Sequence, residues 1–227
     1  MNAISILTAC YNTPPRMILE WWQSVRDQTW SEWRLLLVDD GSTVQETVAE
    51  LNRIATAPRV RLIRLPANRG LAAALNVGLR ECRTEWAARI DPDDVAMPHW
   101  LAGQQDYIAA HPEADIVGCQ LASFDDASGA AMGATVHAEV IDQSILDAQA
   151  RRGWLWFMNH GGVFYRPTQI LALDGGYNES PAFHRAEDGD LWLRAFRAGL
   201  ALRVNPAVLQ RYRRWPHATE APLTPCP

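Results

Sequence analysis

Short apolar runs alternate with amphipathic stretches through the first half of the chain. Four of the runs have the length of buried strands, and they are residues 4–9, 35–38, 60–65 and 86–90. Residues 16–28 space their apolar side chains close to a helical period. We also expect helices over residues 43–54, 71–82 and 100–110, the last of them after Pro98 at a first helical position. Strands that alternate with helices in this way predict an α/β fold, in which helices flank a mostly parallel central sheet.

A cluster of polar residues follows each of the four predicted strands. The clusters are Tyr11-Asn12, Asp39-Asp40, Asn68-Arg69 and the segment from Asp91 to Asp94. Right-handed crossovers bring the C-terminal ends of parallel strands to one edge of the sheet, where such folds bind their ligands. We therefore expect these four clusters to meet at one ligand-binding crevice.

The absence of lysine excludes several reaction classes. All 21 basic residues are Arg. The chain therefore lacks the lysine of a phosphate-binding loop, of a protein kinase and of a Schiff base to pyridoxal phosphate. The formal net charge of −5 argues against binding to nucleic acid, because nucleic-acid-binding proteins normally carry a basic surface.

The cysteines and the lengths of the apolar runs indicate the cellular compartment of the protein. Cys10, Cys82, Cys119 and Cys226 form no C-x-x-C pair, so we expect neither a structural zinc site nor a disulfide framework. The sequence shows no secretion signal and no run of about 18 apolar residues that could span a membrane. Together these features predict a cytoplasmic protein.

The second half of the chain has weaker patterning. We expect strands over residues 115–124, 162–165 and 202–212, and helices over residues 141–152, 167–173 and 187–197. Neither a repeat nor a linker divides the sequence. The pattern therefore predicts a single domain over residues 1–220, followed by a flexible tail over residues 221–227.

The acidic segment Asp91-Pro92-Asp93-Asp94 is the most informative of the polar clusters. Carboxylates two residues apart at a strand exit point to the same side, and they can share a Mg²⁺ or Mn²⁺ ion with phosphate oxygens. The same residues could instead form a turn that caps the next helix. Asp39-Asp40 could likewise cap a helix, or it could accept the N3–H of a uracil or thymine ring. Arg69 could belong to a turn, or it could bring a fixed charge to the same phosphates.

Several motifs, in this order, resemble family 2 glycosyltransferases. The runs I-S-I-L-T-A-C-Y-N, L-L-L-V-D-D-G-S, N-R-G-L-A-A-A-L-N and R-I-D-P-D-D-V-A-M-P resemble the nucleotide-binding half of that family. The later runs N-H-G-G-V-F-Y-R, G-G-Y-N-E-S-P-A-F-H-R and A-E-D-G-D-L-W-L-R-A-F-R-A-G are similar to the acceptor half of its bacterial polysaccharide-synthesis members, the spore-coat type included. The resemblance covers most of the chain.

This resemblance implies a GT-A fold, with a nucleotide-sugar-binding half over about residues 1–110 and an acceptor-binding half over residues 111–220. It implies an inverting, metal-dependent transfer, with a Mn or Mg ion as cofactor. The sugar would come from a nucleotide-diphosphate donor such as a UDP-sugar. It would go to a glycan or lipid-linked acceptor in the synthesis of a surface polysaccharide.

The resemblance also implies roles for individual residues on the donor side. Tyr11 and Asp40 would hold the base, and Arg69 would lie close by. Asp91 would lie at the ribose, and Asp93 would bind the metal ion.

One position on the donor side departs from the family pattern. Members of the family usually have Pro-Thr where this chain has Ala9-Cys10. We therefore expect Ala9 to contribute to nucleotide binding through its backbone rather than through its side chain.

On the acceptor side, the resemblance assigns the general base to Asp188. An inverting transfer needs a carboxylate that removes the proton of the attacking hydroxyl on the face opposite the leaving group. Glu187 and Asp188 could instead compensate the dipole at the start of a helix. Asp190 is a competing candidate, although we expect it to face away from Asp188.

Three residues are candidates for contact with the acceptor or the donor sugar. Glu187 adjoins the predicted base, and His160 precedes two glycines, although a single histidine is more often structural. Trp156 lies with Trp154 in a poorly patterned loop and could stack on a sugar ring or pack inside the protein.

Three other tryptophans are predicted to belong to the core. Trp21, Trp22 and Trp33 lie in helical or strand patterns, where burial is the simplest expectation for a large aromatic side chain.

Six arginines and no acid lie between Arg194 and Arg214. They could form a solvated basic face. They could also contact an anionic membrane surface or a lipid-diphosphate acceptor, which would place the protein at the inner face of the membrane.

Two other functions remain open from the sequence. A nucleotide-sugar binding module without catalysis would keep the donor-side acids, although the presence of Asp188 argues against it. A sugar nucleotidyltransferase is disfavoured because its glycine-rich signature and its lysine are absent.

Overall fold

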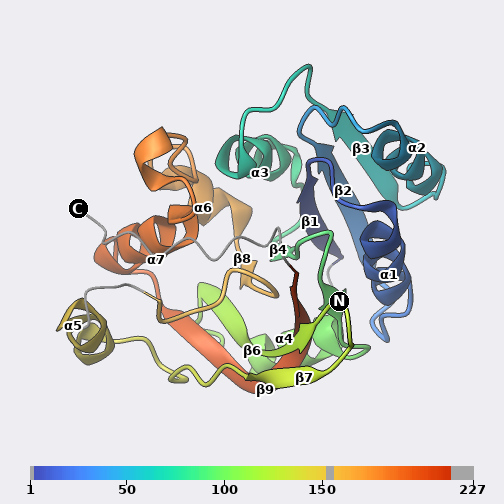
Figure 1. Ribbon diagram of the computed structural model, residues 1–227. Coiled ribbons are helices and arrows are strands. Elements are labelled where there is room, and N and C mark those ends of the chain that lie inside the picture. Colours follow the sequence, from blue (N-terminus) through green and yellow to red (C-terminus); the bar gives the residue numbers. More distant parts are fainter. Residues whose placement is uncertain (1–2, 152–155, 216–227) are drawn as a thin grey trace.

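The first half of the chain folds into a parallel sheet, in the order β3-β2-β1-β4. The strands are β1 (Ile4–Cys10), β2 (Trp33–Asp39), β3 (Val60–Arg64) and β4 (Trp86–Arg89). Figure 1 shows these strands side by side in the computed structural model, which describes residues 3–151 and 156–215. Their C-terminal ends lie at one edge of the sheet, as the sequence predicts.

The second half extends the same sheet with strands of mixed direction. Strand β8 (Phe164–Tyr165) is antiparallel to both β4 and β6 (Ile116–Asp125), whereas β9 (Leu202–Arg214) runs parallel to β6. Two short strands complete the sheet: β5 (Val95–Ala96) pairs with β9, and β7 (Ala131–Ala134) pairs with β6. The expectation of a mostly parallel sheet therefore holds for the first half, whereas the second half is mixed.

The helices cover both faces of the sheet. One face packs against α1 (Pro15–Arg26), α2 (Gln45–Ile54) and α4 (Trp100–Ala110). The other face packs against α3 (Leu71–Glu81), α5 (Gln143–Arg151), α6 (Pro167–Ala172) and α7 (Glu187–Arg197), and a short 3-10 turn, η1 (Pro181–Phe183), precedes α7.

Tryptophans fix α1 against the sheet. Trp21, Trp22 and Trp33 are buried, which confirms their predicted place in the core. The rings of Trp22 and Trp33 meet edge to face, with their centroids 6.3 Å apart. Aromatic side chains of this size bury about 150–250 Å² each. This packing holds α1, and with it the loop that follows β1, in a defined position.

The arginine-rich stretch from Arg194 to Arg214 does not form one solvated basic face. Arg213 is only 2% exposed and forms ion pairs with Glu20 and Asp126. Arg194 pairs with Asp190 along α7. The expectation of a solvated basic face was wrong because the carboxylates that pair with Arg194 and Arg213 lie outside this stretch of the sequence.

Among the described residues, no helix is long and apolar enough to cross a membrane. The predicted tail over residues 221–227, which includes Cys226, lies outside the described residues, and so does Trp154.

Candidate active site

The Asp40 carboxylate organises the loop between β3 and α3. Its Oδ1 accepts the backbone N–H of Arg69 at 2.8 Å, and its Oδ2 accepts the backbone N–H of Gly70 at 2.9 Å and the side-chain amide of Asn68 at 3.0 Å. Burial raises the pKa of Asp40, and the two backbone N–H donors oppose that rise. The predicted base-binding residues Asp40 and Arg69 are therefore in direct contact.

The loops after β1 and β2 are also tied together. Asn12 has a positive φ of 49°, and its Oδ1 accepts the backbone N–H groups of Thr43 at 2.8 Å and Val44 at 3.0 Å. Gly41, with φ 70°, approaches the next loop so closely that a Cβ there would lie 2.7 Å from the Cα of Ala67. Three loops from successive strand ends thus form one surface.

Ala9 and Tyr11 flank the end of β1 on this surface. Ala9 is buried and lies opposite Val38 of β2. Tyr11 is 47% exposed, which is high for a tyrosine next to a buried strand. An exposed aromatic ring beside an acidic loop could stack on a planar base.

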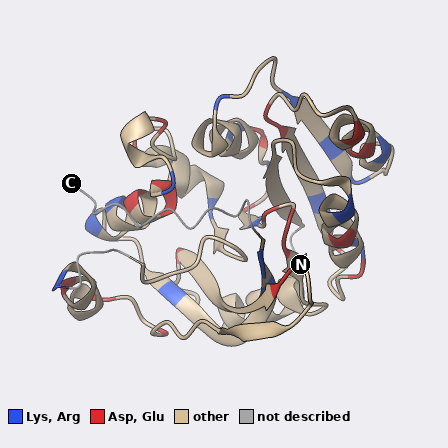
Figure 2. Ribbon diagram, viewed as in Figure 1, with Lys and Arg blue, Asp and Glu red and all other residues tan. Residues whose placement is uncertain are grey.

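The acidic segment after β4 lies on the other side of the β1 end. The thiol of Cys10 is within electrostatic range of both Asp39 and Asp93, and its pKa is raised to about 11, mainly because it is buried. The last residue of β1 therefore lies between the Asp39 carboxylate at the end of β2 and the Asp93 carboxylate in the loop after β4. Figure 2 shows the acidic residues of the loop after β4 near the middle of the molecule.

The three carboxylates after β4 have different surroundings. Asp91 forms an ion pair with Arg89, and Asp93 Oδ2 accepts the indole N–H of Trp215 at 3.0 Å. Asp94 is buried and accepts the Gln210 amide at 2.6 Å and a backbone N–H of β9 at 2.9 Å. Asp94 therefore has a structural role, whereas Asp91 and Asp93 remain partly exposed.

The charges of these acids bear on whether a cation fits. The pKa of Asp93 is raised to about 6, by burial first and then by the neighbouring Asp91 carboxylate. Among the described residues, no group of three or more His, Cys, Asp or Glu side chains could hold a metal ion by itself. Mg²⁺ and Mn²⁺ often use only one or two carboxylates and complete their shell with substrate phosphates and water. The carboxylates of Asp91 and Asp93, which repel one another, are suited to bind such a cation together with the phosphates.

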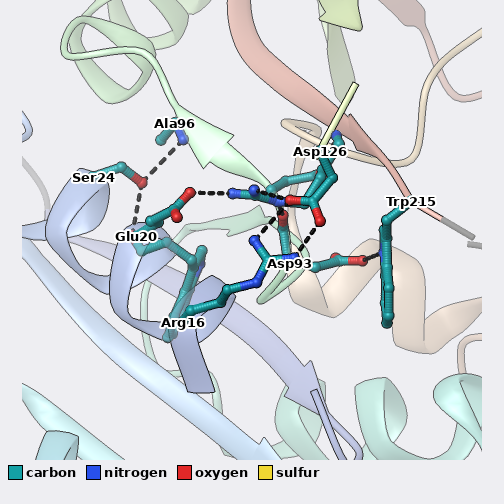
Figure 3. A network of polar contacts seen from close by, with 10 residues as sticks. Arg16, Glu20, Ser24, Asp93, Ala96, Asp126 and Trp215 are labelled. Carbon is teal, nitrogen blue, oxygen red and sulfur yellow. Dashed lines mark hydrogen bonds and ion pairs between the residues drawn. The ribbon is translucent and has the colours of Figure 1, made fainter. Parts of the chain in front are cut away.

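A network of polar contacts around the buried Arg213 connects Asp93 to the end of β9 (Figure 3). Arg213 Nε donates to the backbone carbonyl of Asp93 at 2.5 Å. The other guanidinium nitrogens of Arg213 reach Asp126 at 2.6 Å and Glu20 at 2.5 Å, and Arg16 also pairs with Asp126. Strand β9 thus holds the acidic loop in place from the second half of the chain.

Asp188 lies in the first turn of α7, on the other side of the sheet edge. Its Oδ1 accepts the backbone N–H of Gly189 at 2.8 Å. The pKa of Asp188 is raised to about 6, by burial first and then by the neighbouring Glu187 carboxylate. Asp190 is committed to an ion pair with Arg194 at 2.7 Å, so it does not share the environment of Asp188.

His160 belongs to a cluster of aromatic residues beside Asp188. Its Nε2 lies 2.8 Å from the Tyr177 hydroxyl, and its ring is nearly perpendicular to that of Trp192 on α7. The Tyr177 hydroxyl also lies 3.3 Å from that of Tyr165. Burial lowers the pKa of His160 well below its usual value, so the ring is neutral near pH 7.

Trp156 is 38% exposed, and its ring lies edge-on to His137 with the centroids 5.0 Å apart. His137 Nε2 is 3.1 Å from Asn159 Oδ1, which connects this pair to the same loop as His160. A partly exposed indole in this position could present a ring face to a sugar.

An ion pair joins the two halves across the site. The Arg69 guanidinium lies 3.1 Å from Glu179 Oε2, and Glu179 Oε1 also accepts the side-chain amide of Asn76 at 2.9 Å. Glu179, Tyr177 and Arg89 are not among the site residues predicted from the sequence. Arg89 had a visible signal, since it is the single charged residue in the run W-A-A-R-I.

Comparison with known proteins identifies the family of this chain. The family described as Glycosyl transferase family 2 matches residues 5–168. An uncharacterised glycosyltransferase of Haemophilus influenzae is 30% identical, over 90% of this chain and 73% of its own length. The putative glycosyltransferase EpsE of Bacillus subtilis is 30% identical over 86% of this chain and 67% of its own. AmsE of Erwinia amylovora, an amylovoran biosynthesis glycosyltransferase, is 28% identical over 92% and 75%.

Solved structures show the same fold. The crystal structure of Staphylococcus aureus TarS 1-349 in complex with UDP-GlcNAc superposes with a TM-score of 0.72 at 20% identity. That match covers 94% of this chain and 59% of the TarS chain, so the present chain spans about three fifths of that structure. The mixed sheet with helices on both faces is the GT-A fold. On the family match and the relatives together, this chain belongs to glycosyltransferase family 2.

Proposed function

We propose that this chain is an inverting, metal-dependent glycosyltransferase that moves a sugar from a UDP-sugar to a glycan or lipid-linked acceptor in surface polysaccharide synthesis. The observation that supports this most is the placement of its acids. Asp40 donates its backbone N–H to the carbonyl of Cys10 at the end of β1, Asp91 and Asp93 follow the neighbouring strand β4, and Asp188 lies in the first turn of α7. Residues 1–110 would bind the donor and residues 111–220 the acceptor, within one domain.

On the donor side, the loops fixed by Asp40 would receive the base. Among the described residues, Asp40 Oδ1 accepts a single N–H, from Arg69, so it keeps acceptor capacity for the N3–H of a uracil ring. The exposed ring of Tyr11 would lie against the base, and the backbone at Ala9 would contact it from β1. Asp91 would reach the ribose.

The diphosphate would lie between Asp93 and Arg69. Asp93 would hold a Mn or Mg ion together with the donor phosphates, and that ion, when bound, offsets the charge that develops on the leaving diphosphate. Arg69 would add a fixed positive charge on the opposite side.

On the acceptor side, Asp188 would remove the proton from the attacking hydroxyl. The new bond forms at the anomeric carbon while the bond to the diphosphate breaks on the opposite face, which inverts the configuration. A carboxylate with a pKa of about 6 is a stronger base than an exposed one and is still ionised at pH 7. Glu187, His160 and Trp156 would line the acceptor or the donor sugar.

Names of related proteins support the substrate class. A relative 24% identical to this chain is named as a UDP-Gal:alpha-D-GlcNAc-diphosphoundecaprenol beta-1,3-galactosyltransferase of Escherichia coli, with a lipid-diphosphate acceptor. We propose an acceptor of this general kind, which would bring the protein to the inner face of the membrane.

The test combines binding and turnover. Thermal unfolding with UDP-, dTDP- and GDP-linked sugars, with and without Mn²⁺, should show stabilisation by the UDP-sugars that depends on Mn²⁺. Stabilisation by GDP-sugars alone would contradict a pyrimidine donor. An inactive binding module would be stabilised in the same way but would neither transfer nor hydrolyse the sugar.

Two variants separate the proposed roles. Asp93→Asn should weaken Mn²⁺-dependent UDP binding and abolish transfer. Asp188→Asn should bind the donor as the wild type does, while turnover falls at least about a hundredfold, the scale of a lost general base. Asp106→Asn, an exposed acid on α4, is the control and should leave both measurements unchanged.

A further inference from the structure

Glu179 connects the second half of the chain to the proposed donor site through both of its carboxylate oxygens. Its Oε2 lies 3.1 Å from Nη2 of the Arg69 guanidinium, and its Oε1 accepts the side-chain amide of Asn76 at 2.9 Å. Arg69 precedes α3, and Asn76 lies within that helix. Each oxygen of the carboxylate therefore has its own donor, and both donors belong to the first half of the chain.

Asn76 is a buried anchor for the segment that carries Glu179. It is only 2% exposed. Its amide also donates to the backbone carbonyl of Tyr177 at 2.9 Å, and its Oδ1 accepts the backbone N–H of Tyr177 at 2.8 Å. Because buried polar groups lose free energy when they are left unpaired, these contacts fix the position of the chain just before Glu179.

The backbone at Gly176 allows this segment to approach α3. Its φ is 112°, a conformation that L side chains rarely adopt, and a Cβ there would clash with Oδ1 of Asn76. A glycine at this position thus lets the residues that follow it pack against the helix. The fold of the loop, and not a chance contact at the surface, brings Glu179 to Arg69.

Arg69 is held at both its backbone and its guanidinium. Its backbone N–H donates to Asp40 Oδ1 at 2.8 Å, and its Nη2 donates to Glu179. Within the described part of the chain, Nε and Nη1 of Arg69 have no hydrogen-bond partner. A guanidinium carries five N–H donors in a planar fork, so one edge can stay on Glu179 while the other donors meet phosphate oxygens.

We propose that Glu179 is a positioning residue for the donor diphosphate: held by Asn76, its carboxylate orients the Arg69 guanidinium toward the phosphates. This inference rests on the proposed function, because that function places Arg69 beside the diphosphate. A long side chain that is already ordered loses less conformational entropy when its ligand binds. Glu179 therefore favours donor binding, although its own charge repels phosphate.

Orientation and simple proximity predict opposite effects on the affinity for UDP. If Glu179 orients Arg69, loss of the carboxylate weakens UDP binding. If Glu179 only competes with the phosphates for Arg69, loss of the carboxylate strengthens UDP binding, because a negative charge leaves the site. The direction of the change in affinity therefore decides between the two roles.

The test is a double-mutant cycle that measures the affinity for UDP with Mn²⁺ by calorimetry. Glu179→Gln replaces one acceptor oxygen with an N–H₂ group, so Asn76 and Arg69 can no longer both donate to this side chain. UDP affinity should fall about three- to tenfold, the scale of ordering one long side chain on binding. In the Arg69→Met background the same substitution should change nothing, because Glu179 acts through Arg69. A gain in UDP affinity, or an equal loss in both backgrounds, would overturn the proposal.

Uridine separates an effect on the phosphates from damage to the loop that would bind the base. Uridine carries no phosphate, so its affinity, followed by NMR, should be the same for Glu179→Gln and the wild type. Equal losses of uridine and UDP affinity would mean that the substitution merely deforms the loop, and the proposal would be wrong.

Glu113→Gln is the matched control. Glu113 is also an exposed glutamate paired with an arginine, since it lies 2.7 Å from Arg203. It precedes β6, which runs parallel to β4 because both are antiparallel to β8, so it lies at the edge of the sheet opposite the site. Glu113→Gln should leave the affinities for UDP and uridine unchanged.

The outcomes separate this inference from the proposed function. A wild-type protein that shows the expected cycle but transfers no sugar would refute the proposed transfer alone. A wild-type protein that transfers sugar, with UDP affinity unchanged in Glu179→Gln, would refute the role of Glu179 alone. A wild-type protein that does not bind UDP would refute both.

Discussion

Asp40 accepts the backbone N–H of Arg69 at 2.8 Å, although 29 residues separate them in sequence. With Gly70 and Asn68, which also donate to Asp40, this contact makes one carboxylate responsible for the shape of the loop before α3. The loop that would face the nucleotide base is therefore built by a residue at the end of the neighbouring strand.

Asp40→Asn should both destabilise the protein and weaken nucleotide binding. An amide at this position presents an N–H₂ group to backbone donors, and it leaves at least one buried N–H without an acceptor, at about 1–3 kcal/mol. Urea unfolding would measure the loss of stability, and UDP affinity would be measured on the folded fraction. The exposed Asp106→Asn is the control, and an affinity equal to that of the wild type would contradict the proposed contact with the base.

Gly41→Ala should disrupt the loop between β3 and α3, which Gly41 approaches from the loop after β2. The methyl group would lie 2.7 Å from the Cα of Ala67, in addition to the strain of a residue with φ 70°. Gly129 is a matched control, because it has φ 71° but open space around its Cα. Gly129→Ala should cost about 1 kcal/mol and leave UDP binding intact. Gly41→Ala should cost clearly more and weaken UDP binding, and equal effects of the two variants on stability would show that the close approach is unimportant.

Asp188→Asn should change how stability depends on pH. The pKa of Asp188 in the folded protein is about 6, above its usual 3.8, so the native state holds this proton more tightly than the unfolded chain. The ionised Asp188 carboxylate therefore lowers the free energy of unfolding. This effect is absent below about pH 4 and complete above about pH 6. Relative to the wild type, the variant should gain up to about 3 kcal/mol at pH 8 and roughly half of that at pH 5. Urea unfolding at both pH values checks this, and equal differences at pH 5 and pH 8 would argue against a raised pKa.

Arg213→Met should lower the free energy of unfolding by roughly 1–3 kcal/mol, because it leaves the Asp93 carbonyl without its donor and removes one of the two arginines that pair with Asp126. Arg211, two residues earlier on β9, is exposed and lies over the Phe124 ring. Arg211→Met should cost less than about 1 kcal/mol. Thermal unfolding of both variants distinguishes the buried arginine from its exposed neighbour, and similar losses would contradict the importance of the network.

The first half of the fold was predictable because its signals are local. Helix α4 begins at Trp100 and ends at Ala110, the range predicted from Pro98 just before it, and the parallel strands end at their polar clusters. Strands β5 and β7 were not predicted. Two residues give no periodicity, and the small residues of Ala131–Ala134 give no apolar signal.

The contacts of the candidate site residues could not be predicted from the sequence, because their partners are far away along the chain. Asp93 and Asp188 are visible as candidates, but their neighbours come from distant segments. Trp215 reaches Asp93 across 122 positions, and Arg213 reaches Glu20 across 193. Such contacts leave no local pattern, which is why the arginines of β9 looked like a solvated face and Arg89 looked like an ordinary strand residue.

The path of β9 limits how this chain can be divided. A fragment of the first 110 residues would expose the edge of β4 that pairs with β8 and would lose the arginine that braces the acidic loop. Unpaired strand edges promote aggregation. Expressed alone, that fragment should be insoluble or unable to recognise nucleotides, and it should recover both properties only when the remaining segment is co-expressed to complement it.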